Sequence, residues 1–374
     1  MARVRPGVRA VGEGTALNAM RHWPIAVPLA ALAMLGVSMA VAPTAMLSWT
    51  SFALLIGAVI AAVHHAEVVA HKVGEPFGTL VLALAVTAIE LALLVSLMLV
   101  GGESKSELPR DTVFATVMII SNGVVGLCIL VGALRHQEQS FRIEGVGPAF
   151  AALVTLATLV LVLPGFTTSA PGPLYNVPQL VFVAVSSLVL WLVFVFFQTV
   201  RNRDYFLPPA DPGDEDIHAP KPGTGRTWAS FALLLVALAA VVGLAKALSP
   251  IAEAAVRDAG LPTTLVGVVI ALVVLLPETV AAIRAALADR LQTSMNLAIG
   301  SALASIGLTI PLVVVVAMWI GMPLRLGLDA KDIVLLALTA IVGTIGIGSG
   351  RTNMMQGAVH LLVFFAWLFL AAVP

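Results

Sequence analysis

Charged residues and cysteine are scarce in this 374-residue sequence. Only 11% of the residues are charged, and acids and bases are equal in number, which excludes the strong positive charge typical of nucleic-acid-binding proteins. The single cysteine, Cys128, excludes an internal disulfide. Soluble domains typically contain about 25% charged residues, so the shortage of charge also excludes an ordinary soluble protein.

Apolar residues take the place of charge, at 60% of the sequence with a mean hydropathy of +1.04. They form runs of roughly 20 residues, the length that an α-helix needs to cross about 30 Å of hydrocarbon. The alternating pattern of a membrane β-barrel does not occur. We therefore predict an all-α polytopic membrane protein with about eleven transmembrane helices. The runs lie near residues 24–42, 47–66, 78–100, 112–134, 147–164, 178–200, 228–248, 263–283, 294–320, 331–348 and 354–373.

The loops predict the orientation of the chain. Basic residues gather on the side of the N-terminal arginines, which places the N-terminus in the cytoplasm and the C-terminus on the extracytoplasmic side of the membrane. The first run resembles a signal peptide, because Ala40-Val41-Ala42 has the pattern of a cleavage site. Since Pro43 would hinder cleavage, we expect a retained first helix.

A polar stretch rich in Asp, Pro and Gly divides the chain and indicates a hydrated cytoplasmic linker, whose acids are either simply solvated or sense cations. Without the first helix, an equal and odd number of runs lies on each side, so the second unit crosses the membrane in the opposite sense. The pattern Ala-Glu, six residues, Gly-x-Pro begins at both Ala66 and Ala252, as an inverted repeat predicts. The predicted parts are a tail and first helix (1–46), a first five-helix repeat (47–200), the acidic linker (201–227) and a second five-helix repeat (228–374).

Each unit carries one acid inside an apolar run, Glu90 in the first and Glu278 in the second. A charge inside a bilayer costs several kcal/mol, so an acid there is typical of a functional site. At about 1.5 Å per residue, Glu90 lies roughly 18 Å and Glu278 roughly 22 Å from the face where its run begins. Because the two runs enter from opposite faces, we predict that both carboxylates form one cation and proton site. The alternative is a structural carboxylate bonded to a neighbouring helix.

Oxygen atoms near the two acids are further candidates for that site. Thr87 stands three positions before Glu90 and shares its helix face. Pro277 has no N–H and therefore frees a backbone carbonyl beside Glu278. Oxygen ligands suit hard cations such as Na⁺ and Ca²⁺. The other candidates are Asn122, Ser301 and Ser305, with Ser121 and Thr309 beside them. The alternative for the hydroxyls is that they bond to their own backbone in closely packed helices.

His64, Glu67 and His71 share one helical face at the cytoplasmic end of the second run. Histidine titrates near neutral pH, so this group is a candidate proton path or cation sensor, and Glu253 holds the place of Glu67 in the second repeat. Two alternatives remain open. The residues are ordinary interfacial polar groups, or they bind zinc, although the metalloprotease order His-Glu-x-x-His is absent.

Five segments carry a family resemblance: residues 64–78, the helix around Glu90, Leu-Pro-Glu at 276–278, residues 296–301 and Ser-Gly-Arg-Thr-Asn at 349–353. Together they resemble the bacterial Cha-type calcium and sodium-potassium/proton antiporters of the calcium/cation antiporter superfamily, from about residue 60 to the C-terminus. The resemblance implies one extra helix plus two inverted five-helix units, with the cation carried on Glu90 and Glu278. It also implies a transporter rather than an enzyme, without a cofactor, whose partners are inorganic cations, protons and the lipid bilayer.

The sequence departs from the calcium/proton branch of that superfamily, which has Gly-Asn-x-x-Glu in both repeats. Here Val86-Thr87 and Val274-Leu275 replace the Gly-Asn pairs. Losing both asparagine amides removes two neutral oxygen ligands from a Ca²⁺ site. This loss counts against high-affinity Ca²⁺ coordination, and transport of Na⁺ or K⁺ is correspondingly more open.

A carboxylate held away from water keeps its proton more tightly, whereas a bound cation favours the ionised form. Proton and cation therefore compete for the same oxygens, and alternating access converts this competition into exchange. We predict a secondary active antiporter that exchanges Ca²⁺, Na⁺ or K⁺ for H⁺. The alternatives are a sodium/calcium exchanger without proton coupling, a cation channel, and an intramembrane zinc enzyme built on His64, Glu67 and His71.

Overall fold

The computed structural model of the chain describes residues 13–73, 77–206, 222–260, 262 and 264–373. Most of the predicted acidic linker, and Gly74, Glu75 and Pro76 of the first repeat pattern, lie outside these residues. The helices are α1 (Glu13–Ala40), α2 (Ala45–Val73), α3 (Phe77–Gly101), α4 (Leu108–Met118), α5 (Val125–His136), α6 (Ile143–Ala157), α7 (Val177–Phe196), α8 (Thr224–Asp258), α9 (Thr264–Val274), α10 (Leu276–Leu287), α11 (Leu291–Ala304), α12 (Ile310–Ile320), α13 (Ala330–Gly348) and α14 (Met354–Ala372). The strands are β1 (Gln139–Ser140) and β2 (Arg351–Thr352).

The helical, membrane-spanning character of the chain is confirmed. Within the described ranges, nine helical stretches are long and apolar enough to cross a bilayer, and the bent pair α9 and α10 makes ten. The described apolar part of α3, Leu84–Leu99, is shorter than these. Each predicted run therefore corresponds to a helix or helix pair, but the predicted count of eleven spans is not confirmed.

The outer surface of the bundle is apolar, as a lipid-facing surface must be. Large side chains on the outer helices are widely exposed, for example Trp319 at 81%, Ile345 at 70% and Leu362 at 70%. These side chains stand on α12, α13 and α14. A soluble protein rarely exposes so much contiguous apolar surface, so the bilayer is the environment that this surface fits.

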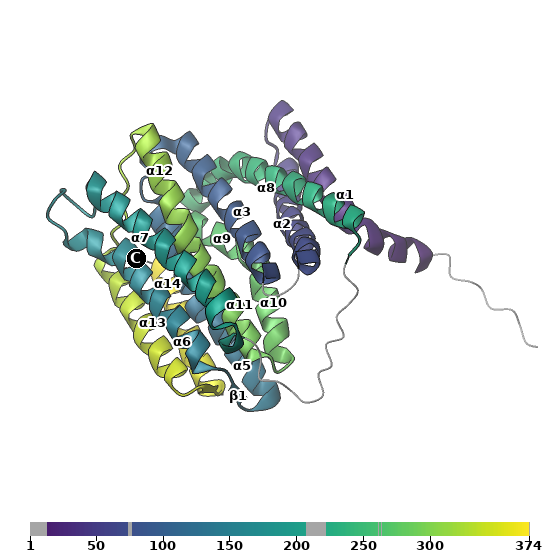
Figure 1. Cartoon of the computed structure of the whole chain (residues 1–374). Coiled ribbons are helices and arrows are strands. Elements are labelled where there is room, and N and C mark those ends of the chain that lie inside the picture. Colours follow the sequence, from purple (N-terminus) through teal and green to yellow (C-terminus); the bar gives the residue numbers. More distant parts are fainter. Residues whose placement is uncertain (1–12, 74–76, 207–221, 261, 263, 374) are drawn as a thin grey trace, which may run out of the picture.

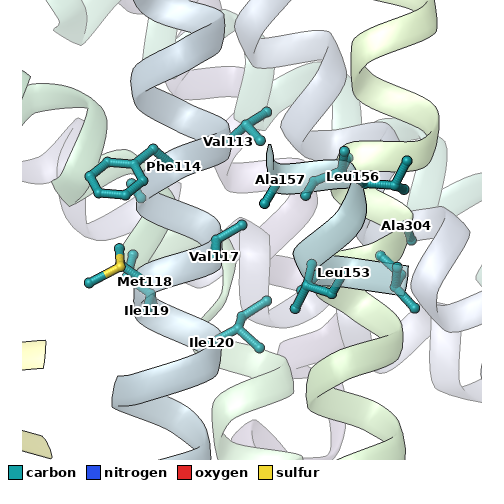
Figure 2. Close-up of a cluster of buried hydrophobic side chains, with 14 of the residues drawn as sticks. Val113, Phe114, Val117, Met118, Ile119, Ile120, Leu153, Leu156, Ala157 and Ala304 are labelled. Carbon is teal, nitrogen blue, oxygen red and sulfur yellow. The ribbon is translucent and has the colours of Figure 1, made fainter. Parts of the chain in front are cut away.

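The helices pack around two hydrophobic cores. The smaller core joins α1, α2 and α8, which lie together at one side of the bundle in Figure 1. The larger core is built mainly by α4 to α7 and α11 to α14. Figure 2 shows part of it, where α4 faces α6 across Val117, Leu153 and Ala157. Because α1 packs on α2 and α8, the structure uses the first apolar run as a helix of the fold.

α3 and α9 lie between the two cores and contribute to both. On α3, Ile89 and Leu93 belong to the smaller core, whereas Leu94 belongs to the larger one. On α9, Val274 faces the smaller core, and Leu275, the next residue, faces the larger one. We call this region between the two cores the seam. The predicted acid Glu90 lies on α3, and Glu278 follows directly after α9 in the sequence.

Backbone contacts between distant loops tie the bundle together at two places. β1 pairs antiparallel with β2, with Gln139 opposite Thr352. At a second place, Leu174 pairs with Arg325 in an isolated bridge. Each contact joins a loop from before residue 200 to a loop from after residue 300. These two contacts therefore connect the first half of the chain to the second.

Candidate functional site

Glu90 is buried inside α3, with 5% of its surface exposed. Ser305, from the second half of the chain, donates a hydrogen bond of 2.5 Å from its Oγ to Glu90 Oε2. Within the described residues Glu90 Oε1 makes no hydrogen bond, although the Thr116 hydroxyl is near enough to act on the carboxylate. A buried carboxylate normally satisfies both oxygens, so the free one is available to a proton or a cation.

Glu278 is equally buried, at 5% exposed, but it stands at a helix start. α9 ends at Val274 and α10 begins at Leu276, with a bend of 52° between the two helices. Pro277 lies in the first turn of α10, where its missing N–H costs no intrahelical bond. No other residue in the described part of the chain donates a hydrogen bond to either carboxylate oxygen of Glu278. The positive end of the α10 dipole thus lies beside the unpaired carboxyl group.

The two acids lie close enough for the charge of Glu90 to act on Glu278. The structure therefore brings together Glu90, Glu278 and Ser305, as the sequence predicts. Ser305 opens a π-helical segment, Ser305–Thr309, between α11 and α12. Such segments widen a helix locally and often occur at functional sites.

The other predicted hydroxyl groups are buried in the same helices. Thr87 lies on α3 and Ser301 on α11, with 3% and 5% of their surfaces exposed. Thr309, at the end of the π-helical segment, is fully buried, and its Oγ1 has no hydrogen-bond partner. This unpaired hydroxyl contradicts the alternative that Thr309 bonds to its own backbone.

A narrow cavity begins at Glu90 and is lined by leucines of α3 and of the start of α4, by small and apolar residues of α9, and by Leu275. Its volume is about 10 Å³, close to the least space that one water molecule needs. Thr112 and Thr116 of α4 supply its polar wall, and Leu108 lies at the start of that helix. Sequence reasoning missed both threonines, although their spacing of four is the same signal that identifies Ser301 and Ser305.

Asn122 does not bond to either acid in this structure. It lies in the π-helical segment Ile119–Val124, where its Nδ2 donates to Thr339 Oγ1 at 2.8 Å. Its Oδ1 lies 3.3 Å from Nδ1 of His360. Asn122 therefore belongs to a second polar cluster, with α13 and α14. Sequence reasoning missed His360, although it is an ionisable residue inside an apolar run, the signal that identified Glu90.

His64, Glu67 and His71 do not form one cluster with the acid pair. The His64 ring packs against Trp23 with a centroid separation of 5.5 Å, while Glu67 and His71 are exposed near the end of α2. Within the described parts of the chain, no three His, Cys, Asp or Glu side chains are placed to hold a metal ion. The predicted proton path or cation sensor at these residues stays a prediction.

Glu253 lies at the other end of the bundle from His71. Its Oε1 accepts a hydrogen bond of 2.6 Å from Lys105 Nζ and another of 3.1 Å from Ser249 Oγ. Lys105 follows the end of α3, whereas His71 precedes the start of α3. Glu253 therefore joins α8 to the loop after α3, and its charge is already paired.

The end of α10 that lies away from Glu278 is anchored to β1. Gln139 Nε2 donates to the Ala286 carbonyl at 2.9 Å and to Asp289 Oδ1 at 2.8 Å. The ring of His136 bonds to the Leu287 carbonyl at 3.0 Å. α10 is thus held at its C-terminal end and carries the unpaired carboxyl group at its N-terminal end.

Known proteins are similar to this chain in sequence and in fold. The family described as "Sodium/calcium exchanger protein" matches residues 43–200 and 229–373. A putative ionic transporter of Sinorhizobium fredii, y4hA, is 51% identical over 87% of this chain and 88% of its own length. The sodium-potassium/proton antiporter ChaA of Escherichia coli is 33% identical over 84% of this chain and 85% of its own length. The crystal structure of the H⁺/Ca²⁺ exchanger CAX has a TM-score of 0.69 at 16% identity, over 96% of this chain and 89% of its own. Because the family match spans both halves of the chain, this protein belongs to the sodium/calcium exchanger protein family.

Proposed function

We propose that this protein is a secondary active transporter that exchanges a cation, Ca²⁺ or Na⁺ and K⁺, for protons at Glu90 and Glu278. The geometry of the acid pair supports this function best. Three of the four carboxylate oxygens have no hydrogen-bond partner among the described residues, although both side chains are buried. Two neighbouring buried acids without a basic partner need either protons or a cation to offset their charge.

The exchange follows from competition for the same oxygens. Removed from water, a carboxylate is stable when it carries a proton or contacts a cation, and costly when it is empty. The empty, doubly charged pair therefore cannot change its exposure from one side of the membrane to the other. The loaded forms can, so each cation that leaves must be replaced by protons.

The cavity at Glu90 supports one of the two access routes. It leads along α3 toward Leu108, at the end of the bundle that carries Lys105 and Glu253. With a cytoplasmic N-terminus, this end faces the extracytoplasmic side of the bacterial inner membrane. We assign the cavity to the outer route, which is narrow because its leucines nearly close it.

The contacts between distant loops support two inverted five-helix repeats, at residues 47–200 and 228–374. The loop before α6 pairs with the loop before α14, through β1 and β2. The loop before α7 pairs with the loop before α13, through Leu174 and Arg325. A two-fold axis in the membrane plane, which relates α6 to α13 and α7 to α14, exchanges these two contacts. That exchange is what an inverted repeat requires.

The ligand set favours a cation that needs few oxygens. Ca²⁺ takes six to eight oxygen ligands, and a site that lacks both asparagine amides must find them in hydroxyl groups, carbonyl groups or water. The printed names of the relatives cover both classes, since ChaA of Escherichia coli is named a sodium-potassium/proton antiporter and a relative from Aphanothece halophytica a Ca²⁺/H⁺ antiporter. We propose Na⁺ or K⁺ as the better substrates at equal concentration, with Ca²⁺ as a weaker one.

Everted membrane vesicles test the exchange directly. A respiratory proton gradient is formed, Na⁺, K⁺ or Ca²⁺ is added over a series of pH values, and proton release from the vesicles is followed with a pH-sensitive dye. Cation uptake with a matched proton release supports antiport. Uptake without a change of pH would instead indicate sodium/calcium exchange, and conduction without a fixed stoichiometry would indicate a channel.

The variants Glu90→Gln and Glu278→Gln link that exchange to the acid pair. Each keeps the size of the side chain and removes its charge, so we expect at least a hundredfold loss of exchange. Glu144→Gln is the matched control, because Glu144 is an exposed residue in the first turn of α6. Unchanged exchange in either acid variant would refute the proposed site.

A further inference from the structure

His360 is a buried titratable residue that the acid pair does not use. It lies on α14 with 3% of its surface exposed. A glycine pair brings α14 and α5 close together at this place. A Cβ at Gly126 would lie 2.8 Å from His360 Cβ, and a Cβ at Gly357 would lie 3.0 Å from the Gly126 carbonyl oxygen. The close approach sets the imidazole against the π-helical segment that carries Asn122.

A chain of hydrogen bonds fixes which nitrogen of His360 carries a hydrogen. Thr339 Oγ1 donates to the Leu335 carbonyl at 2.8 Å, so it can only accept from Asn122. Asn122 Nδ2 donates to Thr339, which leaves Asn122 Oδ1 as an acceptor. His360 Nδ1 is therefore placed to donate across the 3.3 Å to that oxygen, and the backbone carbonyl of Ser121 is a second acceptor for the ring. In the neutral ring, Nε2 is then the free acceptor for a proton.

His360 and Gly346 line the same cavity. A Cβ at Gly346 of α13 would lie 3.7 Å from His360 Nε2, and glycine leaves this space open. The cavity next to it has a volume of about 20 Å³, enough for one water molecule. Ser121 also lines it, with a buried Oγ that has no hydrogen-bond partner among the described residues. An unpaired hydroxyl and a free imidazole nitrogen on one cavity are the groups that hold a water molecule.

The cavity extends toward the β1–β2 end of the bundle. Phe141 and Thr352 line it, and both lie beside the strand pair. The cavity at Glu90 leads to the opposite end, toward Leu108. Thr116 lines that cavity and Ser121 lines this one, so the same transmembrane stretch borders both. The two cavities thus approach the middle of the bundle from opposite ends.

Few charged groups surround the imidazole. α14 packs on α5, α9, α13 and the π-helical segment of Asn122. The segment and α9 contain no titratable residue. The titratable groups of the other two helices are Cys128, Arg135 and His136 on α5, and Lys331 and Asp332 on α13. His136 and Lys331 bond to backbone carbonyls at the helix ends, and Asp332 stands at the far end of α13 from Gly346.

We propose that His360 is a second proton-binding site, which passes protons between water at the β1–β2 end and the acid pair. The proton adds to the Nε2 lone pair from the water in the cavity and leaves from the same atom, while Nδ1–H stays bonded to Asn122. This site rests on the proposed cation/proton exchange and gives the proton a route separate from the cavity at Glu90.

Exchange in proteoliposomes tests the proposal through the pH profile rather than through the rate alone. His360→Gln keeps an amide that can donate to Asn122 but cannot take up a proton at neutral pH. We expect about a tenfold slower exchange and the loss of one step from the pH profile. Asn122→Asp places a carboxylate beside Nδ1, which favours the charged ring, so the midpoint of that step should rise by about one pH unit or more. His22→Gln, at an exposed residue of α1, is the matched control.

An unchanged pH profile in His360→Gln would overturn the proposal. If that variant does not fold, as judged by its elution and melting temperature in detergent, an unchanged midpoint in Asn122→Asp overturns it instead. If the wild-type protein exchanges no protons at all, the proposed function fails, and proton binding at His360 is then decided by direct observation. In ¹⁵N-histidine NMR of the purified protein, with 7 histidines in the chain, the signal lost in His360→Gln should belong to an Nδ1–H tautomer that titrates. A signal with the hydrogen on Nε2, or one that does not titrate between about pH 4 and 9, would overturn the site.

Discussion

Glu90 and Glu278 are the buried acids of the two halves of the chain, but their surroundings differ. Glu90 lies inside the continuous helix α3 and accepts a hydrogen bond from Ser305. Glu278 lies in the first turn of α10, after a 52° bend, and neither of its oxygens has a partner. One acid is therefore oriented by a neighbouring side chain and the other only by its backbone. We infer that the Glu90 carboxylate keeps one position in the site, whereas the Glu278 carboxylate changes its position according to the cation or proton that is bound.

The largest expected effect comes from shortening each acid. Glu278→Asp draws the carboxylate back by roughly 1 Å, and we expect about a hundredfold loss in kcat/KM for the cation. The same change at Glu90 also removes the bond from Ser305, so its loss should be at least as large. Initial rates in proteoliposomes measure both, with Glu144→Asp as the control. Exchange within twofold of wild type in Glu278→Asp would mean that α10 does not set the position of the carboxylate.

The next effect concerns Ser305 alone. Ser305→Ala removes the stronger of the two hydroxyl groups that act on Glu90, the other being Thr116. A hydrogen bond to a carboxylate contributes about 1.5–3 kcal/mol. We expect the cation KM to rise by roughly tenfold, since 1.4 kcal/mol corresponds to a factor of ten. Ser230→Ala, at a buried serine of α8, is the control. If Ser305→Ala leaves KM unchanged, the two acids do not differ in the way described above.

The sequence alone predicts the two acids but only part of their surroundings. It identifies both acids and Ser305, because an acid or a run of hydroxyl groups inside an apolar segment is rare enough to be read from one sequence. It also predicts the helices, since their length and hydropathy are local properties. It does not reveal the direction in which a side chain points around the helix axis. Asn122 illustrates this limit, because its partners Thr339 and His360 stand more than 200 positions away.

The break between α9 and α10 is a second case of partial prediction. Pro277 indicates an interrupted helix, but neither the 52° bend nor the anchoring of α10 by Gln139 is revealed by a local pattern. For the same reason, Glu253 looks like a second copy of Glu67 in sequence. In the structure it pairs with Lys105, a residue 148 positions away.

A smaller effect is expected from the anchor of α10. Gln139→Ala leaves Asp289 and the Ala286 carbonyl without the donor that they now share, which should lower the stability of the fold by about 1–3 kcal/mol. Thermal unfolding in detergent measures this loss, with Gln198→Ala, in the π-helical segment Phe197–Arg201, as the control. Exchange should fall because α10 loses its fixed end. A stability equal to that of the control would show that Gln139 does not anchor the helix.

The smallest effect is expected outside the seam. Glu253→Gln breaks the ion pair with Lys105, in which both side chains are about a quarter exposed. Such pairs contribute about 0–1 kcal/mol, so exchange should stay within twofold of wild type and the melting temperature should change little. A hundredfold loss of exchange would place Glu253 on the transport path. It would contradict the view that only the buried acids Glu90 and Glu278 carry the exchange.

The pairing of β1 with β2 has a consequence for synthesis in the cell. Gln139 and Ser140 acquire their strand partners only when Arg351 and Thr352 have been made. At about 5–20 residues per second, these partners leave the ribosome roughly 10 to 40 s after Ser140. For the whole of that interval β1 lacks its partner strand, and α10, which Gln139 holds, is made only part of the way through it. The last few seconds of translation therefore complete the strand pair after α10 itself has been made, so the anchor of the helix that carries Glu278 gains its final backbone contacts only when the chain is nearly whole.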